Sequence, residues 1–179
     1  TGIGQGYIQT TPIQLCLMTA QIANGGYKIY PKIVLKKYDQ DLKEDKFQPL
    51  VKNSKNIKIV QEAMFSSTNE VRGTSYRSRI DDPKYQFAGK TGTAQVKRIT
   101  KQDRELDLKT LEIPYEERDH ALYVAYGPYR DPRYAVSILV EHGGSGSSVA
   151  APIAKKLFKK IIDRHQIRKD FNSKKYLDI

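Results

Sequence analysis

The stretch FAGKTGTAQV, residues 87–96, looks like a β-strand, yet it carries a lysine, two threonines and a glycine at its centre. Thr91 and Thr93 are two positions apart, so their hydroxyls lie on the same face of a strand. Lys90 and Gly92 face the other way unless a twist or a bulge redirects the lysine. The pattern predicts a cationic, hydroxyl-bearing patch that suits a carboxylate, with a backbone N–H nearby for an oxyanion.

At the edge of a sheet, such a strand also offers backbone N–H and C=O groups on which an extended peptide can dock as an added strand. Gly92 would let a ligand or another backbone approach closely, because it has no side chain. The plainer interpretation is a strand with solvent-facing threonines. The tripeptide K-T-G alone is weak evidence, since a chance match in a chain of this size has a probability on the order of a few per cent.

Two further strands are predicted downstream, HALYVAYGPY (120–129) and RYAVSILVEHG (133–143). The short Arg-Asp-Pro-Arg link between them is typical of a tight turn, so the two strands are expected to form an antiparallel hairpin. A long, polar and charged loop, residues 98–119, separates them from the first strand and has the length of a functional or mobile segment. An interrupted, peripheral strand pair is expected around Pro31.

Helices are expected to cover this antiparallel sheet, which makes the predicted fold α+β. The first helix follows Thr11, which can form a capping box with Gln14, and it ends at the Asn-Gly-Gly of residues 24–26.

Ser54 is expected to cap a second helix, which is followed by a long connection over residues 66–84. The apolar stripe of that helix consists of Ile57, Val60 and Met64. The C-terminal helix carries a two-residue-wide apolar stripe, with lysines on the other face: Ile153, Ala154, Leu157, Phe158, Ile161 and Ile162.

The chain has 179 residues, 39% of them apolar and 28% charged, which is enough for one domain with a real core. No run of about 18 apolar residues is present, so none of its segments is expected to span a membrane. The absence of an initiator methionine and the Gly-rich opening predict a piece of a longer protein. The single cysteine, Cys16, lies among apolar residues and is expected to be a buried, inert thiol.

Much of the net charge of +11 lies near the C-terminus, where residues 155–175 carry nine lysines and arginines against two aspartates. One interpretation is a patch for nucleic acid or acidic lipid. A solvated helix face with a frayed basic tail is favoured, because only Phe171 and Tyr176 are placed there to stack on bases. A basic face near an anionic membrane surface stays open.

Two other features are candidates for a site. The Gly-rich segment EHGGSGSSVAAP, residues 141–152, joins a strand end to a helix start, as anion-binding loops do, although a flexible turn is the favoured interpretation. It matches neither common nucleotide-binding pattern. The histidines His120, His142 and His165 have no metal-binding spacing. Only His120, beside the long loop, is a candidate for lining a site, and a plain strand-end histidine is favoured.

Five segments, in this order, resemble the C-terminal part of the class B penicillin-binding protein transpeptidase domain, especially that of its elongation-type members. They are GIGQGYIQTTPIQL (2–15), NGG (24–26), GKTGTAQV (89–96), HALYVAYGPY (120–129) and YAVSILVEHGGSG (134–146). The resemblance covers residues 2 to about 162 and is weak over 36–58 and 98–118. We therefore expect residues 1–165 to form the C-terminal portion of such a domain, incomplete by itself, and residues 166–179 to form a basic tail.

The family has three signatures, S-x-x-K, S-x-N and K-T-G, and acts through a serine acyl-enzyme. Only K-T-G stands at a matching position, and no serine of this chain begins S-x-x-K. S-x-N occurs at 54–56 and at 67–69, but both follow the GIGQG segment, whereas the family's motif precedes it. The resemblance therefore implies that the nucleophile and its lysine lie outside this chain, which is expected to be inactive alone.

For the whole protein, the resemblance implies a serine that attacks the D-Ala-D-Ala amide of a peptidoglycan stem peptide. The amine of a neighbouring stem peptide then resolves the acyl-enzyme, and β-lactams trap it. Lys90 would provide positive charge and hydrogen bonds, and the hydroxyls of Thr91 and Thr93 would hold the carboxylate. The N–H of Thr93 would serve the oxyanion hole, and Gly92 would keep the strand edge open.

The resemblance further implies no metal or organic cofactor for this step. The expected partners are the stem peptide, β-lactams, the remainder of the transpeptidase domain and the glycan polymerase of the elongation complex. The implied location is the bacterial inner membrane, with this domain facing the periplasm. Two alternatives are an inactive binding or scaffold fragment and a basic nucleic-acid-binding module, the latter disfavoured because no groove-reading element is apparent. Without the serine-bearing helix, the sheet face of 120–127 and 134–140 is expected to lose part of its cover.

Overall fold

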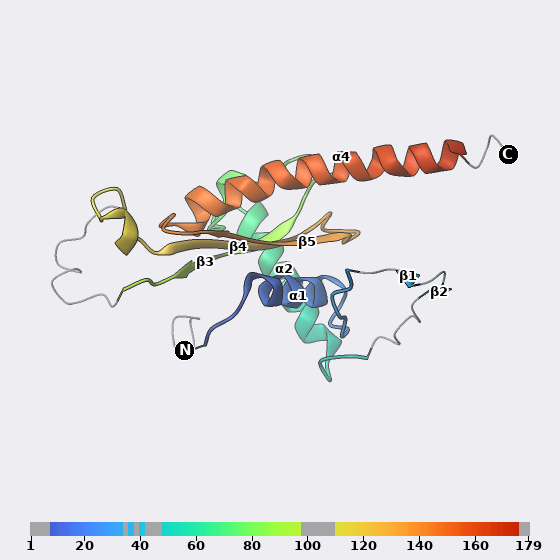
Figure 1. Cartoon of the computed structure of the whole chain (residues 1–179), viewed down its shortest axis with the longest axis horizontal. Coiled ribbons are helices and arrows are strands. Elements are labelled where there is room, and N and C mark those ends of the chain that lie inside the picture. The colour runs from blue at the N-terminus through green and yellow to red at the C-terminus, as the bar shows by residue number, and fades with distance from the viewer. Residues whose placement is uncertain (1–7, 34–35, 38–39, 42–47, 98–109, 176–179) are drawn as a thin grey trace.

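The computed structural model describes residues 8–33, 36–37, 40–41, 48–97 and 110–175, with the backbone alone for 36–37, 40–41 and 166–175. Its centre is a three-stranded antiparallel sheet in the order β3-β4-β5. These strands are β3 (Ala88–Ala94), β4 (His120–Gly127) and β5 (Tyr134–Val140). The sheet and the helices on it confirm the predicted α+β fold (Figure 1).

The register of the sheet is continuous from one end of each strand to the other. Ala88 pairs with Tyr126 and Ala94 pairs with His120, with no bulge between these pairs. The predicted hairpin is confirmed, and its last pair joins Gly127 to Tyr134. β4 ends before Pro128, which has no N–H to offer a ladder, and not at residue 129 as the sequence had indicated.

Helices lie on both faces of the sheet (Figure 1). α1 (Pro12–Ala23) packs on β5 and β4 from one side, and α4 (Ala151–Lys175) lies across the opposite side. α2 (Ser54–Asn69) packs against β3. β3 forms one edge of the sheet, next to α2, and β5 forms the other edge.

The core lies on both faces of β4. Toward α4, Tyr123 is fully buried with Phe87 and Phe158, whose rings stack with centroids 4.9 Å apart. Toward α1 and α2, Tyr126 packs with Met64 in a second buried cluster. This alternation of the two tyrosines follows from the two-residue period of a strand that is covered on both faces.

The predicted capping box of α1 is present. The hydroxyl of Thr11 accepts from the N–H of Gln14 at 3.3 Å, and the side-chain oxygen of Gln14 accepts from the N–H of Thr11 at 2.8 Å. The helix ends at Ala23 and is followed by two glycines with φ near +90°, Gly25 and Gly26. Both glycines occupy the left-handed region, so the Asn-Gly-Gly stop signal works as predicted.

The prediction that Ser54 caps α2 was wrong. The N-cap is Asn53, whose side-chain oxygen accepts from the N–H of Lys55 at 3.0 Å, and Ser54 is the first helical residue. Asparagine and serine are about equally good caps, so the sequence did not discriminate between these neighbours.

α2 is also longer than predicted, since it continues to Asn69 rather than ending before Ser66. Its apolar stripe is only partly buried. Met64 and Thr68 in the C-terminal half are buried, whereas Val60 in the N-terminal half is 40% exposed. The sheet therefore holds α2 mainly by its second half.

The peripheral strand pair predicted around Pro31 is reduced to a two-stranded sheet of two residues per strand, β1 (Lys36–Lys37) and β2 (Gln40–Asp41). An isolated bridge joins Tyr27 to Pro49. Short turns complete the fold: the 3₁₀ turns η1 (Tyr76–Ser78) and η2 (Tyr115–Glu117), and the π turn η3 (Gly146–Ala150), which leads directly into α4.

α4 packs on the sheet through a narrower stripe than the sequence indicated. Ala154, Phe158 and Ile162 are buried at a spacing of four residues, whereas Ile153 is 42% exposed. The helix continues through Lys175, so its backbone is helical on both sides of the predicted division at residue 165. That division into a domain and a tail stays a prediction.

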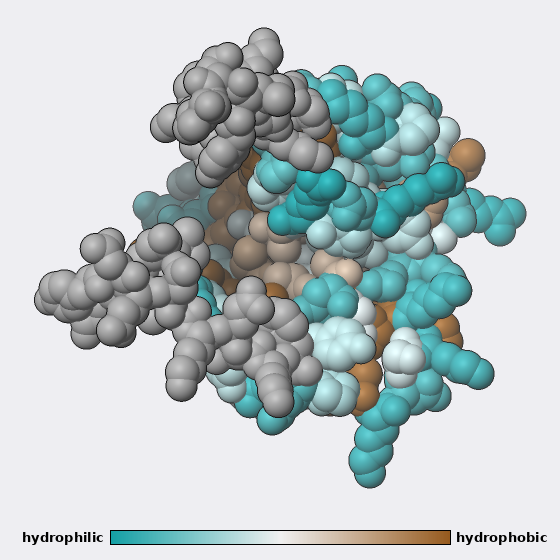
Figure 2. Space-filling view, turned by 90° about the vertical axis from the view of Figure 1, so that its right-hand side faces the viewer, coloured by the Kyte–Doolittle hydropathy of each residue, from teal (hydrophilic) through white to brown (hydrophobic). Residues whose placement is uncertain are grey.

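Apolar surface is open to solvent in the described part of the chain. Figure 2 shows it as brown surface in a recess, with polar side chains to the right of it in this view. Met18 of α1 is 43% exposed and Leu139 of β5 is 39% exposed, and no residue of β5 is fully buried. Among the helices of the described residues, none has both the length and the apolar character that a membrane crossing requires.

Candidate functional site

The free edge of β3 carries the K-T-G residues, and the hydrogen bonds along it define which backbone groups point outward. The side-chain amide of Asn69 donates to the carbonyl of Phe87 at 3.0 Å, and Lys90 Nζ donates to the carbonyl of Thr91 at 3.0 Å. Between them, Thr68 Oγ1 lies 3.5 Å from the carbonyl of Gly89. The carbonyls of alternate residues thus face away from β4, as antiparallel pairing requires.

The same alternation orients the next residue of the strand. Residues 88, 90, 92 and 94 face β4 with their N–H and C=O groups, so those of Thr93 face outward with those of Gly89 and Thr91. The hydroxyl-bearing side chains of Thr91 and Thr93 lie on one face, because their partners Tyr123 and Ala121 both face α4. The predicted side-by-side placement of the two threonines is therefore present.

Lys90 reaches Thr91 although its Cβ is on the opposite face of the strand. Its ammonium group donates to the hydroxyl of Thr91 at 3.1 Å as well as to the carbonyl. Since the register has no bulge, the long side chain achieves this by bending around the exposed edge. The lysine is exposed, and it places a positive charge next to the threonine hydroxyl.

Two residues that the sequence analysis missed extend this group of hydroxyls. Thr74 Oγ1 is hydrogen-bonded to Thr91 Oγ1 at 3.3 Å, and Ser67 Oγ is hydrogen-bonded to Thr74 Oγ1 at 3.2 Å. Both lie in the segment 66–84, which looked like a plain connection because it has no hydrophobic period. The signal that was available was its Gly-Thr-Ser cluster at 73–75 (GTS), a composition typical of a tight turn.

The turn that carries Thr74 is fixed on both sides. A Cβ on Gly73 would lie 2.3 Å from the carbonyl oxygen of Ser67, so only glycine lets the chain fold back onto the end of α2. On the other side, the N–H and the hydroxyl of Ser75 both donate to the carbonyl of Ser67, at 3.0 and 3.1 Å.

A buried hydroxyl cluster lies directly under this turn. The hydroxyl of Tyr123 is hydrogen-bonded to Thr68 at 2.9 Å and to Ser75 at 3.0 Å, and burial raises the pKa of Tyr123. A Cβ on Gly89 would lie 2.4 Å from the Tyr123 oxygen, so this glycine makes room for the cluster. The cluster joins α2, the turn and β4 immediately before the K-T-G residues.

The second candidate segment of the sequence, residues 141–152, packs against the backbone of β3 and β4. A Cβ on Gly146 would lie 2.3 Å from the carbonyl oxygen of Leu122 and 2.6 Å from that of Gly92. Gly146 is buried there at the start of η3. At Gly146 the Gly-rich segment is thus a tightly packed strand-to-helix turn against the K-T-G strand, which is a packing use of glycine.

His120 pairs with Ala94, the residue after Thr93, and the side chains of the three histidines are hydrogen-bonded to residues other than Lys90, Thr91 and Thr93. His120 Nδ1 accepts from the backbone N–H of His142 at 3.0 Å, and their ring centroids are 4.8 Å apart, so the pair ties the start of β4 to the end of β5. His165 on α4 is hydrogen-bonded to Tyr134. The described residues contain no group of three or more side chains arranged to hold a metal ion. The candidate loop of residues 98–119 is described only from residue 110 onward.

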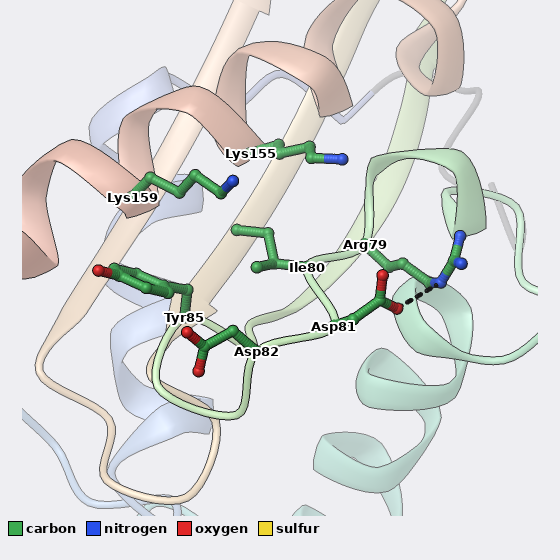
Figure 3. A pocket seen from close by; sticks show the side chains of 7 residues that line it. All are labelled: Arg79, Ile80, Asp81, Asp82, Tyr85, Lys155 and Lys159. Atoms are coloured by element: carbon green, nitrogen blue, oxygen red, sulfur yellow. Dashed lines mark hydrogen bonds and ion pairs between the residues drawn. The ribbon is translucent and has the colours of Figure 1, made fainter.

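One further prediction and one cavity concern residues away from this edge. Cys16 is partly buried and its Sγ donates to the carbonyl of Ala135 at 3.4 Å, and burial raises its pKa, as expected of an unreactive thiol. A cavity of about 280 Å³ lies between α4 and residues 79–85, and Figure 3 shows lysines from α4 facing aspartates from that segment across it. None of its lining residues belongs to β3: Arg79, Ile80, Asp81, Asp82, Tyr85, Lys155 and Lys159.

A comparison with protein families matches residues 1–159 to the penicillin-binding protein transpeptidase domain. This chain belongs to that family. Its K-T-G strand, β3, lies inside the matched range.

Among curated proteins, the chain is 34% identical over 162 residues to the peptidoglycan D,D-transpeptidase MrdA of Haemophilus influenzae, and 29% identical over 167 residues to that of Escherichia coli. The alignments cover 87% and 90% of this chain, but only 24% and 25% of the two relatives. The chain therefore spans about a quarter of the length of these relatives.

Solved structures give the same result. PBP2 of Pseudomonas aeruginosa, in complex with WCK 5153, matches with a TM-score of 0.70 and 36% identity over 89% of this chain and 32% of that one. PBP2 of Helicobacter pylori, in complex with MreC, matches with a TM-score of 0.71 and 29% identity over 90% of this chain and 26% of that one. The expected resemblance to elongation-type members of the family is thus confirmed at the level of sequence and fold.

Proposed function

We propose that this chain forms the substrate-holding wall of a peptidoglycan D,D-transpeptidase site, whose serine nucleophile is supplied by a part of the protein outside these residues. The observation that carries the proposal is the outward-facing edge of β3, which sets Thr91 and Thr93 on one face with the ammonium group of Lys90 beside the hydroxyl of Thr91, in a chain of the transpeptidase family. A cation and two hydroxyls on one strand suit the C-terminal carboxylate of a D-Ala-D-Ala stem peptide.

In the proposed reaction, the serine oxygen attacks the carbonyl of the penultimate D-alanine. The terminal D-alanine leaves with a proton on its amine, and an acyl-enzyme ester remains. The amine of a neighbouring stem peptide then attacks the ester, forms the crosslinking amide and returns the proton to the serine oxygen. β-Lactams enter the same path, but their ring-opened amine stays attached and the ester persists.

The roles of the strand residues follow from their directions. Lys90 supplies positive charge, and Thr91 and Thr93 hold the carboxylate through their hydroxyls. The outward N–H of Thr93 is one donor of the oxyanion hole, and the backbone N–H of the serine is the other. Gly92 keeps the approach open because it has no side chain; a Cβ there would also lie only 3.3 Å from the Leu122 side chain. This chemistry needs no metal or organic cofactor, because the charge of the transition state is met by hydrogen-bond donors.

The proposal extends to the cellular setting of the protein. A transpeptidase of this family acts on peptidoglycan, so we place the domain on the periplasmic side of the bacterial inner membrane, beside the glycan polymerase of the elongation complex. The complex of the Helicobacter pylori PBP2 with MreC is consistent with membership of an assembly.

The test is the substitution Thr93→Val in the intact protein that contains this chain. Valine keeps the branched shape of the strand residue but removes the hydroxyl that holds the carboxylate. A hydrogen bond to a charged group is worth about 1.5–3 kcal/mol, so acylation by benzylpenicillin is expected to slow roughly ten- to a hundredfold. Thr93→Ser retains the hydroxyl and serves as the matched control, with a rate near that of the unmodified protein. Equal rates for all three proteins would remove Thr93 from the site.

A further inference from the structure

We infer that Thr74 is a positioning residue, which orients the hydroxyl of Thr91 for the substrate carboxylate without touching the substrate itself. This inference rests on the proposed function of the β3 edge. It concerns a residue outside the K-T-G motif, 17 positions before Thr91 in the sequence, that the structure brings to within 3.3 Å of the Thr91 hydroxyl.

A threonine hydroxyl has one proton to donate and can rotate it toward several acceptors. If Thr91 is to donate to a carboxylate, its oxygen must receive its other hydrogen bonds rather than give them. Lys90 Nζ, which has no acceptor capacity, already donates to that oxygen at 3.1 Å. Thr74 lies on the other side at hydrogen-bond distance, and as a donor it leaves the Thr91 proton free for the ligand.

Ser67 extends this arrangement. Its hydroxyl lies 3.2 Å from Thr74 Oγ1, and when Ser67 donates to Thr74 and Thr74 donates to Thr91, the three hydroxyls form a single directed chain. Hydroxyls in such a chain polarise one another and strengthen the terminal donor. This chain of hydrogen bonds therefore runs from α2 through the turn and ends at the face of β3 that we propose binds the carboxylate.

The residues on either side of Thr74 are held in place by their neighbours. Thr74 is exposed, so its position depends on its neighbours and not on its own packing. Gly73 closes on the carbonyls of α2, and buried Ser75 is hydrogen-bonded to Tyr123 in the core. A polar side chain that is exposed itself, but held between two anchored residues, is suited to presenting a hydroxyl at a fixed point.

The experiment measures acylation rates of the intact protein with benzylpenicillin and with its methyl ester, which lacks the carboxylate. Thr74→Val is expected to slow acylation by benzylpenicillin about three- to tenfold, the effect of one neutral hydrogen bond, and to leave the already slower reaction with the ester unchanged. Thr74→Ser is expected to restore the rate. In a Thr91→Val background, Thr74→Val is expected to have no further effect, since the residue acts through Thr91.

Adjacent serines of α2 provide the matched control. Ser67→Ala breaks the chain and is expected to slow benzylpenicillin acylation in the same direction as Thr74→Val. Ser66→Ala is expected to leave the rate unchanged, because that hydroxyl is hydrogen-bonded to Glu70 at 2.8 Å and lies outside the chain. Unfolding midpoints of all variants separate a loss of folding from a loss of positioning.

Four results would overturn the inference. Equal slowing with the penicillin and its ester would mean that Thr74 supports the fold and not the carboxylate. Additive losses in the double variant would mean that Thr74 acts independently of Thr91. A normal rate for Thr74→Val together with a slow rate for Thr91→Val would mean that Thr74 has no positioning role, while the proposed role of Thr91 stands. A normal rate for Thr91→Val would rule out the proposed role of Thr91 and the inference with it.

Discussion

Tyr123 and Tyr126 of β4 are both buried, but they differ in the hydrogen bonding of their hydroxyl groups. The hydroxyl of Tyr123 is hydrogen-bonded to Thr68 and Ser75, whereas that of Tyr126 is buried with no hydrogen-bond partner in the described part of the chain. Burial raises the pKa of both phenols, so both are neutral at physiological pH. The contributions of the two hydroxyl groups to the free energy of unfolding should therefore differ because only one of them is hydrogen-bonded.

We predict that Tyr123→Phe lowers the free energy of unfolding of the intact protein by about 1–3 kcal/mol, because it leaves two buried hydroxyls without their shared partner. Tyr126→Phe is expected to be neutral or slightly stabilising, since it removes a buried polar group that has no partner. Urea denaturation monitored by circular dichroism measures both. A larger loss for Tyr126→Phe than for Tyr123→Phe would contradict the hydrogen-bond assignment.

At the scale of single residues, the K-T-G strand was predictable and its support was not. Thr91 and Thr93 share a face because strands have a period of two, which the sequence alone states. Ser67 and Thr74 join them only because α2 and its turn fold against β3; the Gly-Thr-Ser cluster indicates the turn, but not the strand against which it packs. The position of Lys90 was also not predictable, since a flexible side chain bending around an edge leaves no trace in residue spacing.

At the scale of elements, the turn from β5 to α4 holds the K-T-G strand from behind through Gly146. We predict that Gly146→Ala destabilises the protein by about 1–3 kcal/mol, because the new methyl group would overlap the carbonyl oxygens of Leu122 and Gly92 and force the strands or the turn to shift. Thermal or urea unfolding measures the loss. It is expected to be accompanied by slower acylation with benzylpenicillin, since Gly92 belongs to the ligand-facing edge.

Gly25→Ala provides a comparison for that substitution. A Cβ at this position meets only the Tyr27 ring at 3.8 Å, so its cost comes from the left-handed backbone alone and not from overlap with β3. It is expected to destabilise the protein without slowing acylation beyond the loss of folded protein. Gly146→Ala with unchanged stability and unchanged acylation would show that the turn is free to move away from the strand.

The elements themselves were mostly predictable, and the errors have physical causes. The capping box and the two glycines after α1 are local chemistry, so that helix was placed correctly at both ends. The start of α2 was misplaced by one residue because Asn53 and Ser54 are both good caps. The extended region around Pro31 was overestimated, because β-propensity describes a side chain's fit to a packed sheet surface, and the described residues 27–33 form no ladder with such a sheet beyond the single bridge at Tyr27.

At the scale of the whole molecule, the proposed site is incomplete within this chain, since no S-x-x-K sequence occurs in it. We predict that the 179-residue chain alone is not covalently labelled by fluorescent penicillin, whereas the intact protein is. Gel electrophoresis after denaturation measures the label. Serine-linked labelling of the chain alone would contradict the placement of the nucleophile outside it, and absence of labelling in the intact protein would favour the inactive scaffold alternative.

The sequence indicated the incompleteness of the site more directly than the structure did. The absence of the S-x-x-K motif can be read directly from the sequence. A three-stranded sheet with helices on both faces, by contrast, gives no sign of a missing part until its exposed apolar residues are considered. Within the described residues, the expected loss of cover is seen only on β5, where Leu139 is 39% exposed, whereas no residue of β4 is exposed. The extent of that surface depends on side chains from several elements, which residue periodicity does not reveal.

The hydrogen bonds along the edge of β3 also bear on how the protein avoids sticking to itself. An open edge strand attracts any extended chain, and folded proteins protect such edges from uncontrolled pairing. Here the outward carbonyls of Phe87 and Thr91 are occupied by side chains of α2 and by Lys90, with Thr68 beside the one between them. The first half of the strand that carries the proposed site is thereby protected from pairing with a strand of another molecule.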